Sequence, residues 1–424
     1  MRTIVYFLLN MKRHVCVLTA GLLLAFGQCA SADVADIYQV ISNILNIDRN
    51  AGLTTMRSLL IPMGGLDEGM GTAYSAVAKD SSYFEANPAA SSLLEKTELA
   101  VFHNQWIADT KIEGFVYTVR FKNFGIGAGG KWLYLPFTAT DEYGDRVGAG
   151  YHSESMLGAN VSYNFFPGFY YSGLSAGLTA KLAYRSMPTV DDGSTKGNSA
   201  MGYMVDGGLL SRFNFLKYYS SRSKNFSLAL TVKNLGPPVQ GDPLPTLTGF
   251  GLSYSPLRPL TFSLDLTKPL NLVAPSLSES MYGAFGYLIQ FTDFFDFHGG
   301  LLIKGGNPRV SIGSSFDINP AHITVNYTLD LTTQLTPLNR VSVQAAFSLG
   351  DGGRGDIAKK VDTLYLNGLD AYSRSEIDNA IALWEEALAL DPYFDPARES
   401  RDAALASKGL KQTMIELQKI KPNL

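Results

Sequence analysis

The sequence predicts an all-β transmembrane barrel of about fourteen antiparallel strands, followed by a small all-helical C-terminal domain. Three observations lead to this prediction. Apolar and polar side chains alternate between about residues 97 and 349, the links between these segments differ in length, and the periodicity becomes helical after residue 350. The 424 residues include 41 glycines, 24 phenylalanines and 22 tyrosines, a composition that fits an outer-membrane barrel but also a secreted β-sandwich.

The chain begins with a signal for export. Residues 11–32 combine a basic start, an apolar core and the small-x-small pattern Ala30-Ser31-Ala32. This order of features predicts a secretory signal peptide over residues 1–32. The apolar core is too short for a comfortable membrane-spanning helix.

Composition argues against several classes of function. The two cysteines, Cys16 and Cys29, both lie in the signal segment, so the exported chain has no thiol for disulfides, zinc sites or nucleophilic catalysis. Attachment of lipid at Cys29 is an alternative interpretation of this segment. The formal net charge of −3 argues against nucleic acid as a partner. The later histidines are far apart and motifs such as G-x-S-x-G are absent, so we expect no enzyme, no cofactor and no metal site.

Strand alternation is clear in "HITVNYTLD" (322–330), where Ile323, Val325, Tyr327 and Leu329 share one face. About fourteen such segments of about ten residues occur, the length with which a tilted strand crosses a bilayer. They start near residues 97, 111, 123, 153, 172, 199, 225, 246, 259, 280, 293, 308, 321 and 339. A soluble β-sandwich would also show one apolar face, so alternation alone leaves both folds open.

The lengths of the links between the predicted strands favour a barrel over a soluble β-sandwich. Long polar links follow the third, fifth, seventh and ninth predicted strands, whereas short ones follow the second, eighth, tenth and twelfth. Long loops on one side and tight turns on the other are typical of outer-membrane barrels. Two links depart from this alternation of long and short links. The link at residues 109–110 is too short for its side, and the link at residues 214–224 is too long. The barrel is predicted to span residues 96–350, and an even strand number places both of its ends on the periplasmic side.

The C-terminal segment 351–424 is predicted to be a periplasmic helical domain that resembles a tetratricopeptide repeat. Six residues fall where such a 34-residue repeat places its packing residues, and they are Leu364, Gly368, Ala380, Trp384, Ala387 and Pro392. A single repeat cannot bury its apolar face alone. We therefore expect it to pack on the last helix, on the barrel rim or on a periplasmic protein partner.

A turn motif stands at the junction before the first strand. In "YFEANPAASSL" (83–93), Asn87 precedes Pro88 and Ala89. Proline fixes φ and lacks a donor, the residue before it is pushed toward extended geometry, and asparagine can bond neighbouring backbone groups. An ordinary loop turn is the plain interpretation of such a sequence.

This junction resembles the entry sequence of the FadL family of outer-membrane long-chain fatty-acid transporters. The chain also resembles an uncharacterised treponemal family of FadL-like outer-membrane proteins, some of which carry tetratricopeptide repeats. The resemblance implies that residues 33–95 form an N-terminal hatch inside the barrel, with Asn87, Pro88 and Ala89 gating the ligand. It also implies a wall kink in the third strand, where this chain has Gly125, Gly127, Gly129 and Gly130. Two residues, Glu85 and Ala86, separate Phe84 from the motif, which is longer than the family pattern.

The function that the resemblance implies is passive uptake of hydrophobic molecules through the outer membrane, with long-chain fatty acids as ligands and outer-membrane lipid around the barrel. A first alternative is a membrane-anchored adaptor or a secretion or assembly protein that acts through residues 351–424. A second alternative is an open porin, which would conduct ions.

Overall fold

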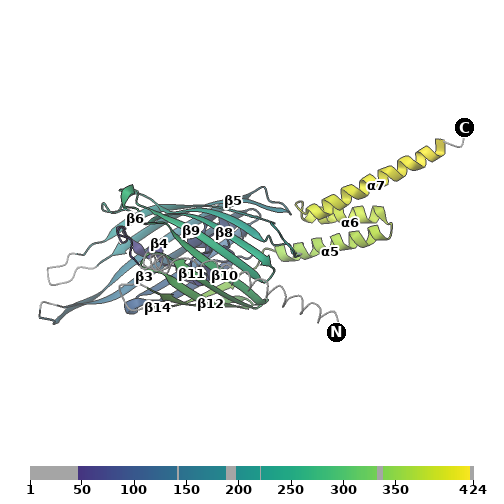
Figure 1. Ribbon diagram of the computed structural model, residues 1–424. Helices are drawn as coiled ribbons and strands as arrows, with labels where there is room; N and C mark the ends of the chain where they lie inside the picture. The colour runs from purple at the N-terminus through teal and green to yellow at the C-terminus, as the bar shows by residue number, and fades with distance from the viewer. Residues whose placement is uncertain (1–45, 141–142, 188–196, 220, 332–337, 421–424) are drawn as a thin grey trace, which may run out of the picture.

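The computed structural model describes residues 46–140, 143–187, 197–219, 221–331 and 338–420, so the predicted signal peptide lies outside the described residues. The described part contains fourteen antiparallel strands that close into one barrel, in which sequence neighbours pair and β1 pairs with β14 (Figure 1). The strands are β1 (Glu98–Gln105), β2 (Lys111–Phe121), β3 (Phe124–Thr140), β4 (Arg146–Phe165), β5 (Tyr171–Ser186), β6 (Ala200–Phe213), β7 (Phe226–Leu235), β8 (Thr246–Leu257), β9 (Leu260–Leu270), β10 (Tyr282–Thr292), β11 (Phe295–Ile303), β12 (Arg309–Ile318), β13 (Ala321–Asp330) and β14 (Leu338–Ser348). The predicted fold class is confirmed.

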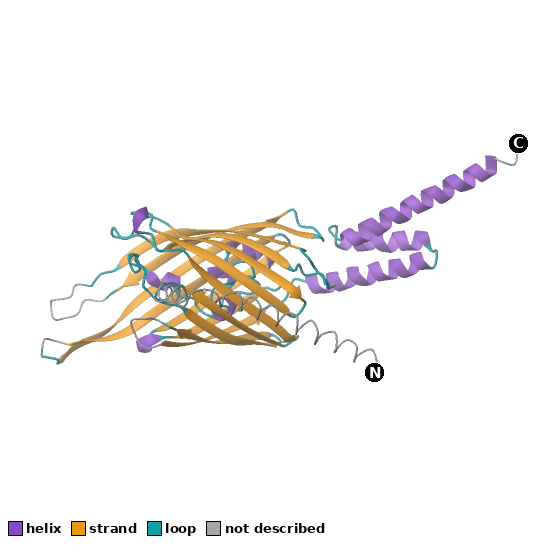
Figure 2. Cartoon of the chain, viewed as in Figure 1, coloured by secondary structure: helices purple, strands orange, loops and turns teal. Residues whose placement is uncertain are grey.

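The short helices belong to the segment before β1 and to two loops, and the long ones follow β14 (Figure 2). They are η1 (Arg57–Leu60), α3 (Gly65–Gly69), α4 (Tyr83–Ala86), η2 (Pro88–Leu93), η3 (Ile107–Asp109), η4 (Pro275–Leu277), α5 (Arg354–Ser373), α6 (Ile377–Leu390) and α7 (Asp395–Ile420). None of the described helices combines the length and the apolarity needed to cross a membrane.

The strands expose apolar side chains and bury small or polar ones. In β5, Leu178 and Leu182 are exposed on the outer face, whereas Ser175 and Thr179 are fully buried. Successive side chains of a strand point to opposite faces, so the alternation in the sequence becomes an apolar outer wall and a polar lumen.

The two ends of the barrel differ. The end that holds the start of β1 has tight connections at 122–123, 258–259, 293–294 and 319–320, and we call it the turn end. The opposite end, the loop end, carries the long β3–β4 hairpin, and the helices α5–α7 stand beyond the turn end (Figure 1). Exposed aromatic side chains such as Phe166, Phe291 and Phe294 lie at the turn end, and aromatic side chains of this kind form girdles at the membrane interfaces of outer-membrane barrels.

The helical domain has its own small core. Trp384 of α6 is 1% exposed and packs against Gly368 of α5, while its Nε1 donates to the carbonyl oxygen of Tyr365 at 3.3 Å. A Cβ at position 368 would overlap the indole, so glycine is what allows the two helices to approach. Leu364, Ala380 and Ala387 are also buried in this core, and Pro392 follows the end of α6. The assignment as a tetratricopeptide repeat stays a prediction.

The helical domain contacts the barrel rim at the turn end. The Arg222 guanidinium, in the connection between β6 and β7, lies 2.6 Å from Asp362 of α5 and 4.9 Å from the ring centroid of Phe394. Phe169, in the connection between β4 and β5, packs edge-on against Phe394 at 5.1 Å between centroids. The connection of residues 214–224, unexpectedly long for its side, thus reaches a helix that the strand pattern cannot reveal.

Replacing Arg222 by alanine is expected to loosen the helical domain from the rim by at most about 1 kcal/mol, because its ion pair with Asp362 is partly exposed and screened. Faster proteolysis of the link 349–353 in the full-length chain would report this loosening. Arg374→Ala, which removes an exposed pair within α5, is the matched control and should leave the cleavage rate unchanged.

Candidate functional site

The segment before β1, here called the hatch (residues 46–97), fills the lumen. Near its start, Asp48 Oδ2 accepts from the backbone N–H of Ser280 at 2.7 Å, at the loop end. Near its finish, the carbonyl oxygen of Leu94 accepts from Arg120 at 3.3 Å, at the turn end. Most residues between these points are buried, and Tyr74, Tyr83 and Phe84 have no exposed surface. The hatch therefore runs the length of the barrel.

The Asn-Pro-Ala motif is the most enclosed part of the hatch. Asn87 is extended, with φ −153° and ψ 111°, and its Oδ1 accepts from the backbone N–H of Ala89 at 3.0 Å. Its Nδ2 donates to the carbonyl oxygens of Ser75 at 3.0 Å and of Leu209 at 3.2 Å. Asn87 thereby caps η2, joins two parts of the hatch and binds strand β6. Asn87, Pro88 and Ala89 lie inside the barrel, so the plain interpretation as a surface loop turn is wrong.

A row of polar wall residues holds the next residues of the hatch. The Ser91 and Ser92 hydroxyls lie 2.6 Å from the hydroxyls of Ser162 and Ser175, respectively. Asn160 Nδ2 donates to the carbonyl oxygen of Pro88 at 3.0 Å. Sequence analysis missed the three wall residues, because nothing local links an inward serine of one strand to a segment about 70 residues earlier.

Two wall glycines make room for the motif. A Cβ on Gly208 would overlap Asn87 Oδ1 and lie 2.9 Å from Pro88 Cδ. A Cβ on Gly177 would overlap the Pro88 carbonyl oxygen and lie 2.7 Å from Ala89 Cα. Gly177 and Gly208 face each other in the β5–β6 register. The motif thus rests directly on bare backbone of the wall.

Two of the four glycines of β3, Gly125 and Gly127, play a similar part. Pairing of β3 with β2 and β4 runs without a register shift from Phe124 to Ala139, so the structure shows no bulge at Gly125, Gly127, Gly129 or Gly130. A Cβ on Gly125 would overlap Ser91, and one on Gly127 would overlap the Tyr83 hydroxyl. The expected kink is thus not marked by any break in pairing. An opening of the wall at β3 stays a prediction.

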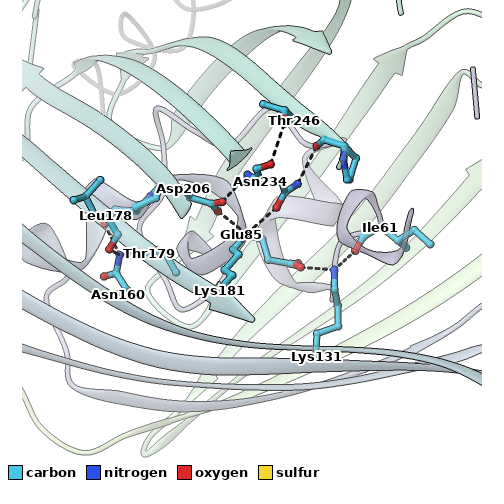
Figure 3. Close-up of polar contacts among 12 residues, drawn as sticks. Ile61, Glu85, Lys131, Asn160, Leu178, Thr179, Lys181, Asp206, Asn234 and Thr246 are labelled. Atoms are coloured by element: carbon cyan, nitrogen blue, oxygen red, sulfur yellow. Dashed lines mark hydrogen bonds and ion pairs between the residues drawn. The ribbon is translucent and has the colours of Figure 1, made fainter. Parts of the chain in front are cut away.

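Buried charges fasten the hatch to the wall. Lys131 of β3 lies 2.5 Å from Glu85 Oε1 and donates to the carbonyl oxygen of Ile61 at 2.7 Å (Figure 3). Arg340 of β14 lies 2.8 Å from Glu68, which also accepts from Asn104 at 2.8 Å. Such buried pairs need each other, since a charge left alone in the interior is costly. These ion pairs hold residues 46–97 against the inner face of the wall.

A cavity of about 520 Å³ remains beside the hatch, toward the loop end. Apolar side chains such as Leu60, Met156 and Leu302 line it together with charged ones such as Asp67 and Lys233. Its mixed lining suits a molecule with an apolar body and a polar group. Across the described ranges, no group of three or more His, Cys, Asp or Glu side chains is placed to hold a metal ion.

Asp67 makes the hatch sensitive to pH. Burial raises the pKa of Asp67 to about 7, and Lys233 opposes this rise only in part. The folded hatch binds this proton more tightly than the unfolded chain does, so its stability falls as pH rises from about 4 toward about 7. We expect the protection of the hatch from hydrogen exchange, after correction for base-catalysed intrinsic exchange, to fall over this window, and Asp67→Asn to remove that slope. An unchanged slope in the variant would contradict the assignment.

An apolar groove of about 810 Å³ lies on the outer wall over β4–β8. Val161, Phe165, Leu178, Leu209 and Leu230 are among the residues that line it. Thr231 and Gly249 line both this groove and the luminal cavity, so at that point a single layer of wall separates them.

Several solved structures align with about two thirds of the chain at low sequence identity. The CymD monoaromatic hydrocarbon channel aligns with a TM-score of 0.49 and 11% identity, over 69% of this chain and 98% of that one. The Pseudomonas putida toluene transporter TodX gives 0.44 and 11%, over 72% and 98%. A Pseudomonas aeruginosa FadL homologue gives 0.42 and 10%, over 66% and 97%.

Sequence comparison places the chain in a family. A UPF0164 protein of Treponema pallidum (strain Nichols) is 29% identical over 370 residues, 84% of this chain and 84% of that protein. A second one from this strain is 25% identical over 372 residues, 82% of this chain and 74% of that protein. The profile of the uncharacterised protein family UPF0164 matches residues 36–352, a range that includes the hatch and all fourteen strands. The chain therefore belongs to the UPF0164 family.

Proposed function

We propose that the protein is an outer-membrane channel for passive uptake of hydrophobic molecules, and that the hatch gates it. This proposal rests on the position of Thr231 and Gly249. Both residues line the luminal cavity and also the apolar outer groove, so only the wall itself lies between the two. A ligand that entered at the loop end would meet the cavity first and reach the membrane-facing groove through this wall.

Physical chemistry favours such a route for an apolar ligand. Each buried CH₂ group is worth about 0.8 kcal/mol relative to water, so returning a long alkyl chain to the aqueous lumen would be costly. The groove volume of about 810 Å³ falls in the range of small-molecule sites. A lumen filled by the hatch also argues against the open porin. In this proposal the outer wall contacts lipid and residues 351–424 lie in the periplasm.

Long-chain fatty acids are the ligands that we propose, on the basis of the Asn-Pro-Ala resemblance. The luminal cavity supports this choice, since the Lys233 amine lines it. A carboxylate head group would be attracted to this amine while the alkyl chain contacts Leu60 and Leu302.

Titration of the full-length chain in detergent with a fluorescent long-chain fatty acid tests this proposal. We expect saturable binding, weakened about tenfold by Asn87→Ala, because the lost amide leaves buried backbone groups unpaired. Asn379→Ala, an exposed change in α6, is the matched control. A parallel titration with an uncharged hydrocarbon separates a fatty-acid site from a general apolar one. No saturable binding by the folded chain would contradict the proposal.

A second candidate function is an anchored adaptor that acts through its helical domain. It is favoured by α7, where Leu410, Met414 and Leu417 are each more than half exposed. Ligand binding by a chain that lacks residues 351–424 would assign the uptake function to the barrel. Loss of that binding, with the barrel still folded, would favour the adaptor.

A further inference from the structure

The ladder between β6 and β7 is interrupted in the middle of β6, where β7 ends. Pairing runs regularly from Phe213↔Phe226 to Gly207↔Val232, then skips to Val205↔Leu235. Residues 200–204 of β6 pair with β5 but have no β7 partner in this register. The other register shifts among the described strands lie within about three residues of the ends of both paired strands, whereas this one lies in the interior of β6. Backbone pairing with β7 therefore closes this seam over only part of the length of β6.

A loop fills the place that β7 leaves. Residues 236–245 connect β7 to β8, and Val239 and Leu244 of this loop are buried in the same apolar cluster as Met56 and Met204. A Cβ on Gly202 would lie 2.9 Å from Val239. Side-chain packing of the loop replaces backbone hydrogen bonds at this part of β6. The loop can therefore move away without breaking hydrogen bonds between strands.

Polar side chains hold the interrupted seam closed (Figure 3). Asp206 Oδ1 accepts from the backbone N–H of Asn234 at 2.7 Å, and its Oδ2 lies 2.5 Å from Lys181 of β5. Asn234 Nδ2 donates to the carbonyl oxygen of Pro245 at 3.1 Å, and its own carbonyl oxygen accepts from Thr246 at 3.0 Å. We call Lys181, Asp206 and Asn234 the latch, since they connect β5, β6, β7 and the start of β8.

The latch faces the cavity, and the groove lies on the outer side of the same seam. Lys181 and Asn234 line the luminal cavity, whereas Gly207 and Leu209 of β6 and Leu230 of β7 line the outer groove. Beside the seam, Gly177, Gly208, Thr231 and Gly249 follow one another across four strands. This row of small residues places no large side chain on the wall beside the seam.

We propose that the β6–β7 seam is the exit through which the ligand leaves the lumen for the membrane, and that the latch closes it. This inference rests on the proposed function. Its position differs from the glycine-rich β3, where pairing is continuous. Opening requires Asp206 to release the backbone of Asn234 and the loop 236–245 to move aside. The hatch motif rests against Gly208 of the same strand, so movement of the hatch and of the seam would be mechanically linked.

Engineered disulfides test the position of the exit. The chain has no cysteine after Cys29, so Leu209→Cys/Leu230→Cys introduces one defined pair across the seam, on opposed outward residues. The matched controls are Tyr117→Cys/Ala128→Cys across β2–β3 and Ile312→Cys/Tyr327→Cys across β12–β13. Each full-length variant is placed in the outer membrane of cells that lack their own fatty-acid transporter, and uptake of radiolabelled oleate is measured after oxidation and after reduction.

We expect oxidation of the β6–β7 pair to lower the uptake rate about tenfold, reversibly, while both controls keep the parental rate. Unchanged uptake with a fully formed β6–β7 disulfide would overturn the assignment of the exit to this seam. A loss of uptake on oxidation of the β2–β3 pair would overturn it as well. Absence of uptake by the parent would overturn the proposed function together with the exit, so the two failures are distinguishable.

A second variant tests the latch itself. Lys181→Met removes the amine that joins Asp206 to Asn234, and we expect oleate uptake to rise severalfold because the closed state loses its buried ion pair. Lys360→Met, which removes an exposed pair between α5 and α6, should leave uptake at the parental rate. An unchanged or lower rate for the folded Lys181→Met chain would overturn the role of the latch.

Discussion

Arg340→Met is expected to destabilise the seated hatch by about 3–5 kcal/mol, because it leaves the buried Glu68 carboxylate without its cation. Asn104 and Thr328 still donate to Glu68, but neutral donors cannot balance its charge. Hydrogen exchange of residues 62–72 should therefore quicken about a hundredfold or more, with barrel amides near β7 little changed.

Lys96→Met provides the comparison for Arg340→Met. Its partner Asp317 is 37% exposed and the two atoms lie 3.4 Å apart, so a loss of at most about 1 kcal/mol is expected. Equal effects of the two substitutions would contradict a hatch held by buried charge. A double variant, Glu68→Gln with Arg340→Met, should recover part of the loss.

Gly208→Val is expected to displace the Asn-Pro-Ala turn from its seat, because the added Cβ would overlap Asn87 Oδ1 and crowd Pro88 Cδ. Overpacking of this kind costs about 1–3 kcal/mol, and more where backbone must move. Two consequences follow, faster hydrogen exchange at residues 83–93 and weaker binding of the fluorescent fatty acid.

The neighbouring residue supplies a matched control for Gly208→Val. A Cβ on Gly207 points to the outer face and has Leu178 Cδ2 as its nearest neighbour at 3.7 Å. Gly207→Val adds the same side chain to the same strand and should leave the hatch exchange unchanged. Slow exchange in both variants would show that the turn does not depend on the bare wall at Gly208.

Much of the barrel could be predicted, because strand alternation is a local signal. The predicted starts lie within about two residues of the observed ones for most strands, for example 321 for β13 and 246 for β8. The exception is β4, which begins at Arg146 rather than near 153. Residues 146–152 form the outer part of the β3–β4 hairpin, where both faces lie outside the barrel and apolar alternation is not needed.

The site could be predicted only in part. The motif at residues 87–89 was recognisable because of its sequence, but its partners were not. Asn160, Gly177 and Gly208 are brought to it only by closure of the barrel. Glycine in a strand signals either a bend or a close approach of backbone, and sequence cannot separate the two. In β3 the structure shows the close approach.

The latch could not be predicted from the sequence either. Lys181, Asp206 and Asn234 look like ordinary inward polar residues of three strands, and only the skipped register brings them together. The sequence does not tell which inward charged residues are buried and which are exposed, because their burial depends on where the hatch lies in the lumen.

Uptake by intact cells tests the central claim most directly. The full-length chain is produced in the outer membrane of cells that lack a fatty-acid transporter of their own, and entry of radiolabelled oleate is followed beside entry of a small hydrophilic sugar. The account predicts saturable oleate entry that Gly208→Val slows, with no gain in sugar entry for the parent. Sugar entry without oleate entry would contradict it and show an open porin.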